Sequence, residues 1–314
     1  SLGVSQTNLG TVLLGVPEQD PNLLGTVPSL SISSAGANST FNANLVVDNG
    51  TLSLAGNPFT AFPTLSPLSN STGSQTWSGN ILLNTPLNLQ GGGGSGTGAT
   101  NFTGTISGPA LWRISNGRVN LQPGSVLSNA GGIFLGNGGF TGILSLLGSA
   151  TGNAPITINF GNNTSLSYAG ASSIPSGPIT TLGGTTGNSA PRIAPLSSST
   201  IPNAFNLTGD VIPVVAGGLT ATWAGPFAGS SALSKITVTS TGLTDNTGTL
   251  VLSNPSNTYS GLMTVGAGKL VVNGGFPGAS AAVNTGATLA GSGTIGGNVT
   301  VNTGGILAPG ASIG

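Results

Sequence analysis

The residues best suited to acid–base chemistry are five carboxylates, and the sequence scatters them. Glu18 and Asp20 are two residues apart in an irregular segment, whereas Asp48, Asp210 and Asp245 each stand alone. Enzymes that cleave polysaccharides use a pair of carboxylates on opposite sides of the scissile bond. Stacked strands can bring distant positions together, so a groove that collected these three aspartates would indicate such an enzyme. Solvated or turn-capping carboxylates are the simpler expectation.

Nucleophilic and metal chemistry lack their usual residues. The chain has no histidine and no cysteine, which removes the general base of a serine triad, thiolate metal sites and disulfides. A serine–lysine pair could be drawn from Ser231 or Ser234 with Lys235, but no serine stands three residues before the lysine. No Gly-Gly-x-Gly-x-Asp calcium repeat occurs either. We therefore expect no enzyme activity and no catalytic, cofactor-binding or metal site.

One glycine pattern could be mistaken for a dinucleotide site. Residues 291–296 read Gly-Ser-Gly-Thr-Ile-Gly, which fits G-x-G-x-x-G, but that fingerprint requires a strand before it and a helix after it. Nothing in the chain indicates a helix, because glycine is frequent and runs of helix-forming residues are missing. The glycines are expected to form turns.

Charge is scarce throughout the chain. Only 3% of residues are charged, five cations against five anions, where an ordinary soluble domain has about 25%. Five scattered cations make no basic face, so nucleic-acid binding is not expected. No apolar run approaches the ~20 residues of a membrane helix. Because so little charge keeps copies apart, self-association is favoured.

A short repeat organises the C-terminal part of the chain. The segment 282–291 is a near copy of 300–309, and identical residues recur 18 positions apart. The pairs are Val283 and Val301, Asn284 and Asn302, Thr285 and Thr303, Gly286 and Gly304, Leu289 and Leu307, and Ala290 and Ala308. A unit this short cannot bury its apolar side chains alone, so it must stack on its neighbours as the rungs of a β-solenoid do.

The same region resembles a known family. The segments 248–253, 257–261 and 268–274, followed by 289–297 and 307–310, are similar to the autotransporter-associated β-strand repeat. That repeat is found in large secreted and surface proteins of bacteria. The resemblance implies an all-β fold, a right-handed parallel β-helix (β-solenoid), and it is specific over roughly the last fifth of the chain.

The rest of the chain carries weaker versions of the pattern. Leu45 to Gly56 repeats the signature, and Asn49-Gly50 and Asn116-Gly117 mark tight corners between apolar runs. Between residues 168 and 234 seven prolines interrupt the pattern, which indicates irregular loop insertions. The expected divisions are an N-terminal cap or strand-donating arm (1–41), a β-solenoid (42–167), a Pro-rich irregular insertion (168–234) and a regular β-solenoid with autotransporter-type repeats (235–314).

Together these features predict a structural protein outside the cell. The sequence begins with Ser1 rather than Met, and no basic segment precedes an apolar run, so we expect a processed product whose export signal has been removed. We expect a secreted or cell-surface β-solenoid whose copies associate into an extracellular fibre or surface layer. The alternative is the passenger stalk of an autotransporter adhesin that binds host or neighbouring cells through a cell-surface or polysaccharide ligand. A polysaccharide-active enzyme is the third and least favoured interpretation.

Overall fold

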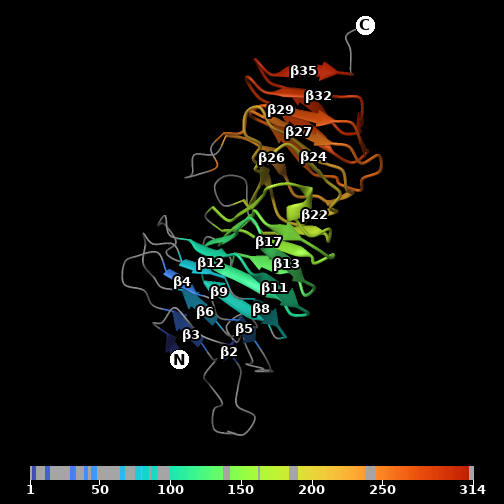
Figure 1. Ribbon diagram of the computed structural model, residues 1–314. Helices are drawn as coiled ribbons and strands as arrows, with labels where there is room; N and C mark the ends of the chain where they lie inside the picture. The colour runs from blue at the N-terminus through green and yellow to red at the C-terminus, as the bar shows by residue number, and fades with distance from the viewer. Residues whose placement is uncertain are drawn as a thin grey trace.

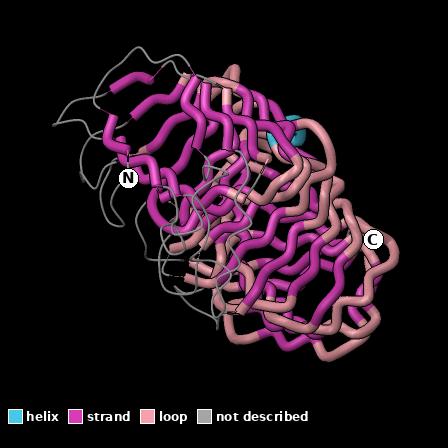
Figure 2. Tube along the Cα trace, turned by 90° about the horizontal axis from the view of Figure 1, so that it is seen from below, coloured by secondary structure: helices cyan, strands magenta, loops and turns pink. Residues whose placement is uncertain are grey.

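The computed structural model describes most of the chain. From residue 99 to residue 310 it covers everything except 137–141, 162, 184–189, 238–242 and 244; before residue 99 it covers residues 75–78, 80–84, 86–90 and the backbone of earlier strands. Figure 1 shows the strands stacked along one axis, from β2 and β3 near the N-terminus to β35 near the C-terminus. Figure 2 shows the same strands as successive layers.

Most turns of the chain place one strand on each of three faces, which we name A, B and C. Face A contains β1 (Leu2–Val4), β3 (Ser29–Ile32), β6 (Thr64–Pro67), β9 (Leu87–Gln90), the first half of β12 (Trp112–Leu121), β14 (Ile133–Leu135), β17 (Ile156–Asn159), β19 (Ile179–Leu182), β22 (Phe205–Leu207), β25 (Phe227–Gly229), β30 (Gly275–Phe276) and β33 (Thr294–Ile295).

Face B contains β2 (Thr11–Leu14), β5 (Asn44–Val47), β8 (Ile81–Leu83), β11 (Thr105–Gly108), β13 (Val126–Asn129), β16 (Ser149–Ala150), β21 (Ser199–Ile201), β24 (Thr220–Trp223), β27 (Thr249–Leu252), β29 (Lys269–Val272), β32 (Thr288–Gly291) and β35 (Ile306–Pro309). A single-turn 3₁₀ helix, η1 (Ala171–Ser173), lies between β16 and β21.

Face C contains β4 (Ser39–Phe41), β7 (Gln75–Trp77), β10 (Thr100–Phe102), the second half of β12, β15 (Gly142–Leu146), β18 (Ser165–Tyr168), β20 (Arg192–Pro195), β23 (Ile212–Pro213), β26 (Leu233–Lys235), β28 (Leu262–Val265), β31 (Ser280–Val283) and β34 (Val299–Val301). The strand pairings along all three faces are parallel. The expected all-β parallel solenoid is confirmed.

The 18-residue repeat of the sequence is the rung of the solenoid. Val283 pairs with Val301, and Leu289 pairs with Leu307, so identical residues lie directly above one another. The side chain of Asn302 also donates to that of Asn284 at 2.8 Å. Because identical residues stack on one another, the same packing and hydrogen bonds recur in each rung, and repeats of this kind therefore form solenoids.

Inward-facing aliphatic and aromatic side chains form one continuous core. On face A, Ile133, Ile156, Ile179, Phe205 and Phe227 follow one another in register, and each is 1% exposed or less. Alternation along every strand sends neighbouring residues to the outer surface. The core therefore runs as columns parallel to the axis of the stack rather than as a central cluster.

Aromatic rings thicken the core midway along the rod. Trp223 stacks on Phe205 with ring centroids 4.3 Å apart, and Phe205 stacks on Phe227 at 4.8 Å. The indole Nε1–H of Trp223 donates to the Tyr168 hydroxyl at 3.3 Å, so the polar atom of each ring is satisfied inside the core.

Corners are closed by buried asparagines and by glycines with positive φ. Asn257 accepts a hydrogen bond from the Phe227 amide at 2.9 Å and donates to the Gly275 carbonyl at 2.9 Å, tying its own turn to the rungs on both sides. Asn129 and Asn203, both buried, occupy the same corner in earlier turns. These side chains replace hydrogen bonds that the bent backbone cannot make to itself.

Strand β12 turns the corner between faces A and C without a break. The Asn116-Gly117 pair, predicted from sequence as a tight corner, lies at this bend, where Gly117 has φ 80° and the Asn116 side chain accepts from its amide at 2.9 Å. A positive φ is costly for residues with a Cβ. The other predicted corner, Asn49-Gly50, lies outside the described residues.

Residues 168–234, for which the sequence indicates an irregular insertion, contain strands β19 to β25 of the same three faces. The prolines stand at the ends of these strands rather than inside them: Pro178, Pro191 and Pro226 each precede a strand, and Pro195 and Pro213 each end one. Proline carbonyls here still accept hydrogen bonds from an adjacent rung: that of Pro226 accepts from the Phe205 amide of the preceding rung at 2.8 Å, and that of Pro191 from the Ile212 amide of the following rung at 2.8 Å. In residues 1–41, β1 to β4 pair with the following strands.

Candidate functional site

The described carboxylates stabilise turns. Asp210 accepts from the Ala232 amide at 2.8 Å. Asp245 accepts from the Gly217 amide at 2.7 Å and from the hydroxyl of Thr247 at 2.7 Å, and these hydrogen bonds hold the pKa of Asp245 below its usual range. Glu18, Asp20 and Asp48 lie outside the described residues. Within the part of the chain that is described, no group of three His, Cys, Asp or Glu side chains could hold a metal ion.

Ser234 and Lys235, the neighbouring residues considered above as a catalytic pair, point to opposite sides of their strand. In β26, Leu233 and Lys235 face one side and Ser234 the other, because successive residues of a strand alternate. Lys235 is 0% exposed, and its Nζ donates to the Asn246 carbonyl at 2.6 Å, to Asn246 Oδ1 at 2.9 Å and to the Ala267 carbonyl at 3.1 Å. Burial lowers the pKa of Lys235 to about 8, while Asp245 opposes the change.

The glycines of the 291–296 pattern are required by close packing between rungs. A Cβ on Gly291, Gly293 or Gly296 would collide with the backbone carbonyl oxygen of the rung beneath it. Gly291 also has φ 118°. The pattern therefore marks turns, as the sequence predicts.

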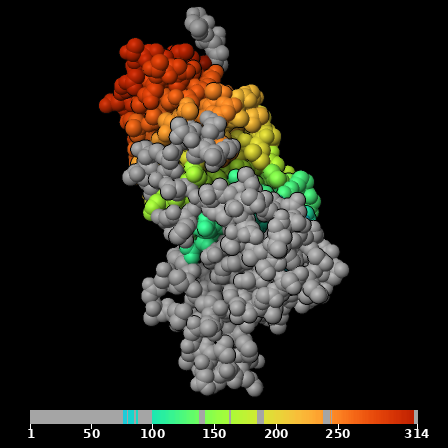
Figure 3. Space-filling view, turned by 90° about the vertical axis from the view of Figure 1, so that its left-hand side faces the viewer, coloured from blue at the N-terminus to red at the C-terminus, as the bar shows by residue number. Residues whose placement is uncertain are grey.

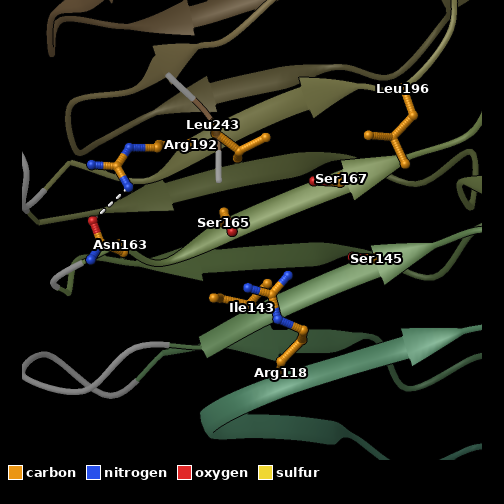
Figure 4. A pocket seen from close by; sticks show the side chains of 9 residues that line it. All are labelled: Arg118, Ile143, Ser145, Asn163, Ser165, Ser167, Arg192, Leu196 and Leu243. Carbon is orange, nitrogen blue, oxygen red and sulfur yellow. Dashed lines mark hydrogen bonds between the residues drawn. The ribbon is translucent and has the colours of Figure 1, made fainter. Parts of the chain in front are cut away.

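A half-enclosed pocket of about 160 Å³ lies on the outer surface of face C. Its floor is a column of residues paired in register across four rungs: Arg118, Ile143, Ser165 and Arg192. Figure 4 shows the side chains of this column together with their neighbours. The remaining lining residues are Ser145, Ser167, Asn163, Leu196 and Leu243.

The pocket is positively charged. Arg192 is 1% exposed, and its Nη1 donates to Asn163 Oδ1 at 2.7 Å. Burial lowers the pKa of Arg192. Arg118 is partly exposed, and none of the described residues that line the pocket is acidic. Sequence reasoning missed this site because the two arginines are far apart in the chain, and turns of unequal length hide their register.

The segment between β26 and β27, which we name the excursion, contributes Leu243 to one wall of the pocket. Its described residues Ile236 and Leu243 pack on a small apolar cluster outside the core. The members of that cluster are Ala190, Ala194, Ile212 and Val214. The base of the excursion is closed by Asn246, which binds Lys235 and donates to the Pro213 carbonyl at 2.7 Å.

The final described rung presents core positions to the outside. Val299, Val301 and Leu307 occupy inward positions in register with the buried residues of the rung below, but are 39%, 41% and 49% exposed. A cavity of about 180 Å³ lies beside them, lined by Leu289 and Ile295 among others. Figure 3 shows this end of the rod in red. We name Val299, Val301 and Leu307 the end surface.

The fold and its stacked repeat define the class of protein: a parallel β-solenoid in which short repeats stack as successive rungs. Residues 245–272 match the family model of the passenger-associated-transport-repeat, a stretch that begins at the excursion and includes β27 and β29. Repeat and fold together fit an autotransporter passenger β-helix, and this repeat family implies a secreted or cell-surface protein. No curated protein and no solved structure matches the chain. No helix in the described residues is long and apolar enough to cross a membrane.

Proposed function

We propose that this chain is an architectural segment of a secreted or cell-surface rod, without an enzymatic role, and that its copies associate end to end. The observation that carries the proposal is the end surface. Its three side chains are nearly half exposed, whereas the residues in register with them in the preceding rung are buried. The two described aspartates, which bind turns rather than one another, support the architectural reading.

Strand edges and low charge favour a second copy as the occupant of the end surface. The backbone groups of β34 and β35 pair with β31 and β32 on one side, and an open strand edge is a template for another strand. The whole chain has only five cations and five anions, so electrostatic repulsion between copies is small.

The expected association is weak. Fully burying an aliphatic side chain stabilises by about 1.5–3 kcal/mol, so covering three that are half exposed contributes roughly 2–4 kcal/mol. Association itself costs at least ~4 kcal/mol in lost freedom. Backbone hydrogen bonds between rungs must therefore supply the balance, and assembly is expected to depend steeply on concentration.

Analytical ultracentrifugation with negative-stain microscopy tests the proposal on the whole chain, from about 1 µM to about 1 mM. We expect rods whose lengths are multiples of one molecule. Leu307→Asp, which puts a charge in the end surface, should leave single rods. Ala308→Asp is the matched control, because Ala308 is the next residue of the same strand and faces outward.

Two outcomes would overturn the end-to-end arrangement. Single rods at every concentration would assign the end surface to further rungs of the same polypeptide rather than to a second copy. Assembly that survives Leu307→Asp would place the contact elsewhere on the rod.

A second candidate function, the stalk of an adhesin, is favoured by the arginine-lined pocket on face C. A passenger rod that displays a binding face along its side would attach to cells without assembling. Adhesion of protein-coated beads to bacterial and epithelial cells, compared with beads carrying an Arg118→Gln variant, separates the two functions.

A further inference from the structure

The pocket on face C concentrates the positive charge of a chain that has very little. Two of the five cations in the sequence, Arg118 and Arg192, line it. They stand three rungs apart, with Ile143 and Ser165 between them in the same column. At ~4.8 Å per rung their Cα atoms are about 14 Å apart. In Figure 4 the side chain of Arg118 extends beside Ile143, between the two arginine rungs.

The other polar groups of the pocket suit a hydroxylated ligand. Ser145, Ser165 and Ser167 place hydroxyl groups on two adjacent outward columns of face C, and Asn163 adds a carboxamide. Each serine hydroxyl can donate one hydrogen bond and accept two. This mixture of donors and acceptors matches the hydroxyls of a sugar ring, whereas the guanidinium groups can only donate.

Size and apolar contact narrow the ligand further. The pocket volume is about 160 Å³, and a cavity of ~150 Å³ is known to hold one benzene ring. The space therefore fits a single six-membered ring. Leu243 on the excursion, with Ile143 and Leu196, offers aliphatic contact for the C–H face of such a ring.

We propose that this pocket binds one acidic sugar residue, with Arg118 and Arg192 holding its carboxylate or sulfate and the serine column holding its hydroxyls. Charge-assisted hydrogen bonds from arginine to carboxylate are among the strongest in proteins. Such residues occur in extracellular and cell-surface polysaccharides, which a rod outside the cell would meet. The inference does not rest on end-to-end association.

Titration of the whole chain with glucuronate, glucose and inorganic sulfate, followed by NMR or calorimetry, tests the proposal. For a ligand this small we expect a dissociation constant on the order of 1 mM for glucuronate. Glucose and sulfate should each bind at least roughly tenfold more weakly, since each lacks half of the interactions.

Two substitutions assign the binding to the pocket. Arg118→Gln, at a partly exposed position, should weaken glucuronate binding roughly ten- to a hundredfold without changing the melting temperature. Arg113→Gln is the matched control: Arg113 lies on face A of the same strand, 5.7 Å from the ring centre of Phe134. Its substitution should leave binding unchanged.

The overturning results are equally specific. Equal affinity for glucose would remove the role of the arginines, and equal affinity for sulfate would reduce the site to one for small inorganic anions. An equal loss in Arg113→Gln would mean that binding follows overall charge. Repeating the titration in the Leu307→Asp background keeps the result independent of association, so a failure of one proposal is distinguishable from a failure of the other.

Discussion

Replacing Lys235 with methionine should abolish an unusual rise of stability with pH. In the folded chain burial lowers the pKa of Lys235 to about 8 from an ordinary value of 10.5. Between those two values the unfolded chain holds a proton on this amine that the folded chain has lost. Because stability rises with pH wherever the unfolded state binds more protons, the free energy of unfolding should increase across this interval.

The size of the effect follows from the pKa difference. A fall from 10.5 to about 8 corresponds to ~3 kcal/mol in total, and about 2 kcal/mol of it should appear between about pH 7.5 and about pH 9.5. Two buried tyrosines set the upper limit. Burial raises the pKa of Tyr168 to about 12 and raises that of Tyr259 as well. Their contribution is complete below pH ~10 and is lost above it, so the curve should turn downward there.

Urea unfolding followed by tryptophan fluorescence is the assay, because Trp223 is a buried core residue of β24, two strands before Lys235 in β26. Wild type and Lys235→Met are compared at matched pH values below 10, so that groups common to both cancel. Methionine keeps the length and most of the volume of the side chain. The expected difference between the two curves grows with pH. Parallel curves, or a wild-type curve that falls between about pH 8 and pH 9.5, would refute the reasoning.

Three further predictions concern the corners and the core. Asn257→Ala removes a buried corner side chain with partners in both adjacent rungs, and it should lower the free energy of unfolding in urea by about 2–4 kcal/mol. The control is Asn284→Ala, at an outward position with one side-chain hydrogen bond to the next rung. It should lower the free energy of unfolding by about 1 kcal/mol or less. Gly291→Ala should lower the melting temperature at least twice as far as Gly286→Ala, because both have positive φ but only Gly291 faces a backbone collision. Trp223→Ala should cost about 3–5 kcal/mol and abolish the near-ultraviolet circular dichroism of the stacked rings. A loss below ~1 kcal/mol would mean that the core is not packed as described.

The fold could be predicted from the sequence where successive rungs have nearly equal lengths. Between residues 282 and 309 identical residues recur 18 residues apart, and they are in register in the structure, as with Leu289 and Leu307. The looser spacing of 20 that links Leu250 to Leu270 is a true register as well. A constant repeat length makes the periodicity visible because each rung must return to the same point on the face.

Elsewhere in the chain the turns differ in length, and the register of the strands could not be predicted from the sequence. Successive face-A positions Ile156, Ile179 and Phe205 are 23 and then 26 residues apart, so no fixed period reveals them. The prolines in this region predict interruptions of the strands, yet several stand at strand ends, where the missing amide donor costs little. Stacking between rungs therefore tolerates prolines that, judged from the local sequence alone, argue against a strand.

The same irregularity explains why the arginine pocket could not be foreseen. Arg118, Arg192 and Lys235 are three of the five cations in the chain, and the turns that bring them to face C differ in length. The interior columns fix where each strand lies, and extra residues can leave only at the corners. Between β26 and β27, Leu243 packs against the outside of face C, and Asn246 contacts Lys235 beneath that face. Burying a charged side chain is costly, and the chain contains few charges. A purely architectural rod would not require three of its five cations to lie on or beneath face C.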